Sequence, residues 1–365
     1  MASRSSALAV VNVVALLVLC GWPATPTEAH THFGAYNQTC PQAEEIVFKE
    51  MTAVVAKSPE LAGALLRLFS VDCLVGGCEG SILLNSTANN TAEKDSPLNK
   101  GLRGFDVVDS IKAKLETACP GIVSCSDILA LAARDSVRIT KGPYILITTG
   151  REDGNRSSAA DVDSSSFKAG ATVTDLIAIF SKFNLTAKDV AVLSGAHTIG
   201  KAHCSSFSPR LYNFTSNGAS DPTLDANYTT TLRGQCKAGD LATLVDLDPS
   251  SGTTFDLGYY RDVAASRGLL STDAGLLLDA DTRAYVLRQA NATTTDEFFA
   301  DFAVSFVNMS KIGALSDHKG EIRRVCSAVN PPSASHSAAT LTTRSAHGVL
   351  LATSLLAVFA LALVL

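Results

Sequence analysis

Two short segments carry oxygen-bearing side chains at spacings that suit a hard cation. Residues 72–81 contain Asp72, Glu79 and Ser81 among three glycines, and residues 248–256 contain two further aspartates. Calcium takes about six to eight oxygen ligands, from side chains and from the backbone carbonyls of flexible loops. Both segments therefore fit calcium sites, although each alone would equally fit a turn with a helix cap.

The placement of histidine limits the acid–base chemistry open to the chain. None of the 7 histidines lies between His32 and His197. Arg67 and Val71 are four residues apart, so on a helix both side chains face the same cavity. His197 precedes a glycine-rich turn, and a histidine in that context alone is more often structural than a ligand.

The cysteines indicate disulfide bonds formed in an oxidising compartment. One of the nine, Cys20, lies in an N-terminal apolar segment. An even number then remains, which in a secreted chain predicts four disulfides, although sequence alone does not choose their pairing. Zinc is the alternative, but no paired C-x2-C spacing supports it. The eight remaining cysteines are Cys40, Cys73, Cys78, Cys119, Cys125, Cys204, Cys236 and Cys326.

Both ends of the chain carry apolar segments that we interpret as targeting signals. Arg4, an apolar run over 7–19 and small residues up to Ala29 predict a signal peptide over 1–29. The alternative is a buried N-terminal helix, since the run is too short to span a bilayer. A Ser/Ala/Thr-rich linker over 331–348 precedes an apolar tail over 349–365. The tail predicts a GPI-attachment signal, with a tail-anchoring helix or a vacuolar sorting extension as alternatives.

The composition fits a globular extracellular protein. The chain is 46% hydrophobic, which supplies a sizeable core, and its formal net charge is −5. A mild acidic balance without basic blocks argues against a nucleic-acid partner. Nine N-glycosylation sequons fit an extracellular surface: Asn37, Asn85, Asn89, Asn155, Asn184, Asn213, Asn227, Asn291 and Asn308.

Apolar periodicity between residues 30 and 330 is mostly helical. Strand-like alternation is clearest over 144–149, and no internal repeat is present. We therefore predict an all-α fold with long loops held by disulfides. The clearest predicted helices cover residues 60–72, 105–118, 125–137, 173–183 and 295–312.

Seven runs of residues, in consistent order between Thr31 and Asn330, resemble the class III (secretory plant) haem peroxidases. Two examples are LLRLFSVDCLVGGCEGSILL from Leu65 and DVAVLSGAHTIGKAHC from Asp189. The other runs cover 92–112, 119–137, 255–260, 267–276 and 320–326.

The resemblance implies a haem-dependent peroxidase fold in the 30–330 region. Two helical domains, a distal half over roughly 30–150 and a proximal half over roughly 151–330, would sandwich haem b in a monomer. Because no C-x-x-C-H motif is present, the haem would not be attached covalently in the c-type manner. The resemblance also implies two structural calcium ions and the disulfides Cys40–Cys119, Cys73–Cys78, Cys125–Cys326 and Cys204–Cys236.

Family positions assign roles to several residues. His197 stands at the position of the axial iron ligand, and Asp273 at that of the carboxylate that holds the ligand's other ring nitrogen. The set matching the first calcium site is Asp72, Val75, Gly77, Glu79 and Ser81, where Glu79 replaces the commoner aspartate. The set matching the second is Thr198, Asp248, Ser251 and Asp256, to which Thr254 could add a carbonyl.

The distal helix departs from the family pattern at its catalytic position. The family reads R-L-H-F-H-D-C, whereas residues 67–73 read R-L-F-S-V-D-C. Arg67 keeps the arginine that stabilises the departing peroxide oxygen, but Val71 replaces the histidine that transfers the peroxide proton. Such general acid–base catalysis contributes about 10²–10⁴-fold. Ser70 replaces an aromatic side chain, which predicts a more open pocket.

Two further features bear on activity. Glu93 and Asn99 stand where the family orients the missing histidine, and without it we expect them mainly to hold the loop and the calcium shell. The family's proline-containing donor segment is replaced by Ser166-Phe167-Lys168, so delivery of phenolic donors is also affected.

The sequence predicts a secreted peroxidase-type oxidoreductase, extracellular or anchored at the plasma membrane, with impaired turnover. It would oxidise small aromatic, phenolic-type donors with hydrogen peroxide, which is reduced to water. The alternative is a non-catalytic cell-surface glycoprotein that keeps the scaffold and acts by binding, with or without haem.

Overall fold

Helices are the main regular structure of the described residues. A computed structural model describes residues 31–164, 171–215 and 218–332. The chain divides into two units, Met1–Val329 and Asn330–Leu365, and almost all described residues belong to the first. The predicted signal peptide, the 166–168 segment and the predicted C-terminal tail lie outside the described residues.

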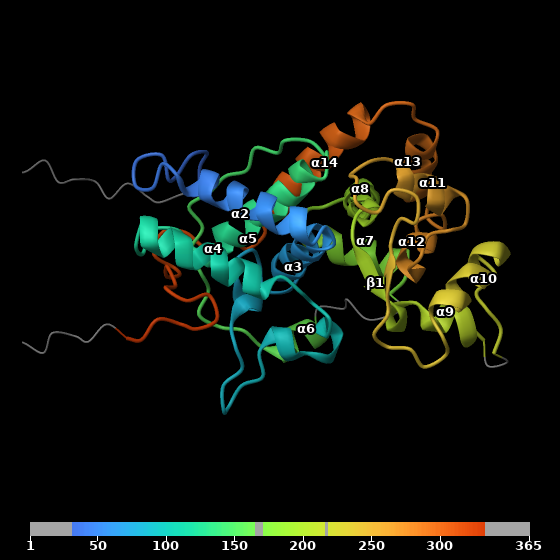
Figure 1. Cartoon of the computed structure of the whole chain (residues 1–365), viewed down its shortest axis with the longest axis horizontal. Coiled ribbons are helices and arrows are strands. Elements are labelled where there is room, and N and C mark those ends of the chain that lie inside the picture. The colour runs from blue at the N-terminus through green and yellow to red at the C-terminus, as the bar shows by residue number, and fades with distance from the viewer. Residues whose placement is uncertain (1–30, 165–170, 216–217, 333–365) are drawn as a thin grey trace, which may run out of the picture. The chain divides into compact units, whose positions relative to one another are not determined.

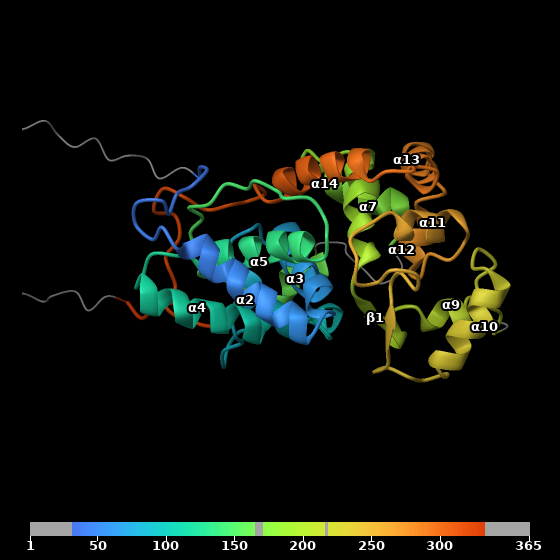
Figure 2. The same ribbon diagram turned by 45° about the horizontal axis from the view of Figure 1, so that its top comes forward.

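Three long helices pack around α5 (Cys125–Ile139), and the group of four is seen from two directions in Figures 1 and 2. Its residues from Cys125 to Val137 are all buried, because α5 packs against α2 (Ala43–Lys57), α3 (Leu61–Val75) and α4 (Phe105–Ala118). Ser124 caps the start of α5 by accepting a hydrogen bond from the Asp127 amide at 3.1 Å.

A second group forms around α8 (Ala187–Ser194). This helix packs against α7 (Val173–Ser181) and α13 (Ala280–Ala290), and α13 in turn packs against α11 (Gly258–Ala264). The long α14 (Asp296–Met309) contacts both α8 and α3 and so connects the two groups.

The remaining elements are short. The β1 strand (Lys201–His203) pairs antiparallel with β2 (Leu244–Asp246). The short α-helices are α6 (Ala159–Ser164), α9 (Ser208–Tyr212), α10 (Ala226–Gln235) and α12 (Ser271–Gly275). The 3-10 helices are η1 (Ser81–Leu83), η2 (Glu93–Asp95), η3 (Pro97–Asn99), η4 (Gly195–Thr198) and η5 (Cys204–Ser206).

The all-α prediction is confirmed, and the strand-like alternation over 144–149 does not correspond to a strand. In that segment only Thr149 forms a bridge, to His32. The alternation is real, since Ile145 and Ile147 are buried whereas Leu146 is exposed. One side of the segment faces the core while no strand runs beside it. The strand-like sequence pattern therefore reflects alternating burial and not pairing with another strand.

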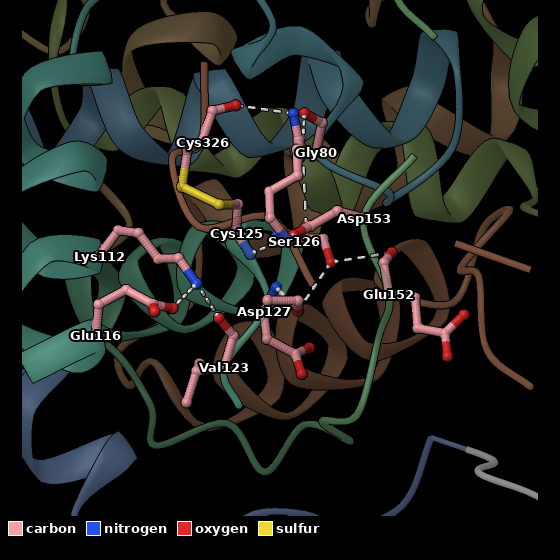
Figure 3. The surroundings of a disulfide bond; sticks show 12 residues. Gly80, Lys112, Glu116, Val123, Cys125, Ser126, Asp127, Glu152, Asp153 and Cys326 are labelled. Atoms are coloured by element: carbon pink, nitrogen blue, oxygen red, sulfur yellow. Dashed lines mark hydrogen bonds and ion pairs between the residues drawn. A yellow bond between two sulfur atoms is a disulfide. The ribbon is translucent and has the colours of Figure 1, made fainter. Parts of the chain in front are cut away.

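Four disulfides join the pairs that the resemblance implies: Cys40–Cys119, Cys73–Cys78, Cys125–Cys326 and Cys204–Cys236. Cys125–Cys326 links residues 201 positions apart in the sequence. Figure 3 shows it near the buried Lys112, whose ammonium donates to the Val123 carbonyl at 2.7 Å and pairs with Glu116 at 2.6 Å. No helix among the described residues is long and apolar enough to cross a membrane.

Candidate active site

His197 lies on η4, directly after α8, with its ring orientation fixed by Asp273. The His197 Nδ1 and Asp273 Oδ1 are 2.8 Å apart. A carboxylate can only accept, so Nδ1 is the donor and the other ring nitrogen, Nε2, is left for a ligand. Asp273 is itself held, since it accepts from the Tyr259 hydroxyl at 3.0 Å and from the Leu270 amide at 2.8 Å.

Close backbone packing brings the histidine segment against the distal helix. A Cβ on Gly63 of α3 would lie 2.6 Å from the Gly200 Cα. Gly200 also has a φ of +92°, a conformation that favours glycine. The two glycines therefore let α3 approach the segment that follows η4 much more closely than larger residues would.

A central cavity lies between α3 and η4. From α3 it is lined by Arg67 and Ser70, and from η4 by His197. His197 keeps 32% of its side-chain surface exposed. His203 lies on β1 and also lines this cavity. The predicted iron ligand and the predicted distal arginine thus line one space, as a haem site requires.

A second, distal cavity continues from the same face of α3. Eight residues line it: Arg67, Ser70, Val71, Leu74, Val75, Leu98, Asn99 and Val162. Arg67 and Val71 share this cavity, as their four-residue spacing predicted. The lining holds no histidine, aspartate or glutamate, so no side chain there can accept a proton at neutral pH.

Arg67 keeps its charge but has no ionic partner among the described residues. Its side chain lines the two cavities and is exposed to them, while the protein packed around it lowers the pKa of Arg67 below the ordinary value. Arginine stays protonated in proteins even so. It is therefore a cation available to an anion or a polar ligand in the cavities.

The residues that would orient a distal histidine are still in place. Asn99 lines the distal cavity beside Val71 and donates from Nδ2 to the Glu93 carbonyl at 2.9 Å. Burial raises the pKa of Glu93 to about 7, and its Oε2 has no hydrogen-bond partner among the described residues. The Glu93 and Asn99 geometry therefore survives without the imidazole it would serve.

The first predicted calcium set gathers around the end of α3. Asp72 is buried, and this burial raises its pKa to about 8, although it accepts from the Gly80 and Ile82 amides. The Ser81 Oγ is buried near the Glu93 carboxylate and makes no hydrogen bond of full geometry. A Cβ on Gly76 would lie 2.8 Å from the Ser81 Oγ and 3.6 Å from a Glu79 oxygen. A buried hydroxyl close to the Asp72 and Glu79 carboxylates suits a cation.

The second predicted set converges more tightly. The Thr198 hydroxyl lies 3.2 Å from Asp248 and 3.3 Å from Asp256, and 3.4 Å from the Thr254 carbonyl. The Ser251 hydroxyl lies 3.0 and 2.9 Å from the same two carboxylates. Two carboxylates thus face the same two hydroxyls.

No group of three or more His, Cys, Asp or Glu side chains in the described ranges is arranged to hold a metal. Both predicted calcium sets depend instead on carboxylate pairs supplemented by hydroxyls and carbonyls. Hydroxyl and carbonyl oxygens are acceptable calcium ligands, so this observation and the prediction are compatible.

Comparison with known proteins agrees with this geometry. A family model described as Peroxidase matches residues 47–292. The chain belongs to the peroxidase family. Peroxidase 1 of Oryza sativa subsp. japonica is 46% identical over 323 residues, covering 87% of this chain and 99% of the relative. Peroxidase 27 of Arabidopsis thaliana is 48% identical over 298 residues, covering 81% and 91%. The class III resemblance is thereby confirmed, and the chain is a peroxidase-type oxidoreductase by family.

Sequence reasoning missed Tyr259 and Gly195 in this peroxidase. Tyr259 adds a second hydrogen bond to Asp273. A Cβ on Gly195 would lie 2.6 Å from the Phe298 ring and would also strike the Tyr260 hydroxyl. Tyr259 and Tyr260 both lie in the 255–260 run (FDLGYY), but the run alone did not indicate which side chains they contact.

Proposed function

We propose that this peroxidase binds haem b through His197 and reacts with hydrogen peroxide far more slowly than a family member with a distal histidine. The distal cavity carries this proposal, because Arg67 and Asn99 line it but no side chain that accepts a proton does. When bound, haem supplies the iron at which hydrogen peroxide is reduced and phenolic-type donors are oxidised.

On the proximal side, Asp273 keeps the Nδ1 proton of His197 in place and increases the basicity of Nε2. Tyr259 and the Leu270 amide hold the carboxylate in turn. This arrangement fixes both the tautomer and the direction of the imidazole. The imidazole would thus be held as a rigid, electron-rich ligand for the haem iron.

On the distal side, Arg67 can donate hydrogen bonds to a peroxide oxygen and stabilise negative charge developing on it. Removing the peroxide proton and returning it to the other oxygen would fall to solvent, since Val71 has no titratable group. The loss of a positioned acid–base group lowers the rate by about 10²–10⁴-fold. Substrate access is less restricted, because the small Ser70 side chain lines both cavities.

Two calcium ions are part of the proposal. The first would bind Asp72, Glu79, Ser81 and the carbonyls of Val75 and Gly77. The second would bind Thr198, Asp248, Ser251 and Asp256. Thr198 follows His197 directly, so an ion there would hold η4 in position.

Reconstitution tests this function. The purified chain, incubated with haem and calcium and then desalted, should keep the absorbance of bound haem. Mixing it with hydrogen peroxide, without a donor, should then give a slow spectral change. No retained haem would overturn the proposed cofactor, and a rate as fast as that of a typical relative would overturn the impairment.

The second candidate function is a non-catalytic binding glycoprotein of the cell surface, and Val71 is the observation that favours it. Retained haem with no reaction with peroxide, even at long times, would support this candidate over a slow enzyme. Loss of haem binding together with an intact fold would support a scaffold that acts without the cofactor.

The proposed location is extracellular, with GPI attachment at the plasma membrane. All nine sequon asparagines are exposed, which leaves each open to glycosylation. Release from cells by a phosphatidylinositol-specific phospholipase would support the anchor. Recovery of the 349–365 peptide in the mature protein would reject it.

A further inference from the structure

Three tyrosine rings form a continuous row that begins at His197. The Tyr259 ring meets the His197 ring edge-on at a centroid distance of 5.7 Å. The Tyr259 and Tyr260 centroids are 5.2 Å apart, and those of Tyr260 and Tyr285 are 5.7 Å apart. All three tyrosines are buried, at 0–2% exposure. We call Tyr259, Tyr260 and Tyr285 the tyrosine row.

The far end of the row lies just beneath the surface. Lys188 and Arg288 stand over the Tyr285 ring at 5.8 and 5.0 Å from its centroid. Their side chains are 53% and 49% exposed. One layer of flexible, half-exposed side chains therefore separates Tyr285 from solvent.

The row differs chemically from the rest of the aromatic core. Phenylalanine rings also pack against the row, but they are very hard to oxidise. The Phe298 ring, for example, has its centroid 5.1 Å from that of Tyr260. Tryptophan, the other readily oxidised aromatic, occurs once in the chain, as Trp22 in the predicted signal peptide. Tyrosine is thus the only aromatic residue type in the predicted mature chain that could readily carry an oxidising equivalent.

Oxidation of a tyrosine also requires a place for its proton. The Tyr260 hydroxyl donates to the Ala191 and Val192 carbonyls, which are poor bases. Lys188, which stands over the Tyr285 ring, also pairs with Asp301, so this carboxylate lies near Tyr285 and raises the pKa of its hydroxyl. Lys188 holds Asp301 at 2.7 Å. Tyr259 also meets a carboxylate, but Asp273 is already occupied by His197 and lies at the inner end of the row. Tyr285 is therefore the member near the surface at which an oxidising equivalent could come to rest, with its proton on Asp301.

We propose that the tyrosine row conducts electrons from Tyr285, near the surface, to haem bound at His197. Donors too bulky for the central cavity would then be oxidised at Tyr285. The proposal rests on the proposed function, since haem oxidised by hydrogen peroxide is the oxidant. One electron passes inward through Tyr260 and Tyr259, and the Tyr285 proton moves to Asp301. A phenolic donor at the surface then returns one electron to the neutral Tyr285 radical. Asp301 returns the proton, and the oxidised donor loses its own proton to solvent.

The test removes the dependence on peroxide. The chain is reconstituted with zinc protoporphyrin IX, and binding is checked by absorbance. Light and a soluble electron acceptor then withdraw one electron from the bound porphyrin, the acceptor being reduced. A nitroso spin trap, followed by peptide mass spectrometry, locates the tyrosine that becomes a radical.

The expected result is an adduct at Tyr285 that falls at least tenfold in the Tyr260→Phe variant, which keeps the ring packing. Tyr144→Phe is the matched control, because Tyr144 is 56% exposed and lies outside the row, and it should leave the Tyr285 adduct unchanged. Adducts chiefly at Tyr144, or a Tyr285 adduct of equal yield in Tyr260→Phe, would overturn the proposal. Failure of the porphyrin to bind would reject the cofactor as well as the row, whereas bound porphyrin without a Tyr285 adduct rejects the row alone.

Discussion

Individual side chains of this peroxidase divide into those that keep a catalytic arrangement and one that breaks it. His197, Asp273, Arg67 and Asn99 lie where the proposed chemistry needs them, and Val71 lies among them without a titratable group. The i,i+4 relation of Arg67 and Val71 was predictable because helix geometry fixes it. The support that Asp273 receives from Tyr259 was not, because it depends on tertiary packing between α11 and α12.

The Asp273 carboxylate should decide how firmly haem is held. Asp273→Ala removes the acceptor for the Nδ1 proton of His197, so we expect haem affinity to fall about 10–100-fold. Haem titration followed by absorbance measures this. His203→Ala is the control, because His203 lines the same cavity but bonds the Ala242 carbonyl instead. Equal losses in both variants would contradict the assigned ligand.

At the scale of elements, the long helices were predictable and the short strands were not. Helices such as α4 and α5 show clear apolar periodicity, whereas β1 and β2 have three residues each and too little pattern to recognise. The 144–149 segment is the opposite case. Burial of one side gives it a strand-like pattern, but it does not form a strand. The first predicted calcium set comes from one short segment, whereas in the second Thr198 meets Asp248 from 50 positions away in the sequence, which the sequence pattern alone did not indicate.

The η4 turn should be sensitive to a single methyl group. Gly195→Ala would press a Cβ against the Tyr260 hydroxyl and the Phe298 ring, and overpacking of this kind costs about 1–3 kcal/mol. Urea unfolding gives the free-energy change. Gly234→Ala is the matched control, because a Cβ there meets no atom within 4 Å and should stabilise α10 by up to about 1 kcal/mol. An unchanged unfolding midpoint in Gly195→Ala would show that η4 is not tightly packed.

Calcium should stabilise the two oxygen-rich segments. Binding to the folded state alone adds about 2.7 kcal/mol when the free ion is at 100 times its Kd. We therefore expect the Tm to rise with calcium and fall with a chelator, and magnesium to substitute poorly because it requires near-octahedral geometry. Asp256→Asn should reduce the calcium-dependent part of this shift. A Tm independent of calcium in the intact chain would rule out both sites as structural.

At the scale of the whole molecule, disulfides tie together segments that are far apart in sequence. Cys125–Cys326 joins the start of α5 to the end of the described chain, next to the buried Lys112 shown in Figure 3. The pairing followed from family resemblance, because eight cysteines alone leave it open.

Loss of the long-range disulfide should cost more stability than loss of the short one. On the chain-entropy account, removing Cys125–Cys326, with a separation of 201, costs about 5 kcal/mol, and removing Cys73–Cys78, with a separation of 5, costs about 2 kcal/mol. Denaturation midpoints of the two double-alanine variants under non-reducing conditions measure the difference. The reverse order would indicate that local packing around the Cys73–Cys78 turn outweighs chain entropy.

The second-order rate of the ferric, haem-loaded protein with hydrogen peroxide, before any donor is added, tests the central claim most directly. We expect a slow wild type and a gain of about 10²-fold or more in Val71→His, because Arg67, Glu93 and Asn99 already surround that position. Val71→Ala, which changes the volume without adding a base, should remain slow. A wild type as fast as a typical relative, or a Val71→His variant no faster than Val71→Ala, would contradict the account.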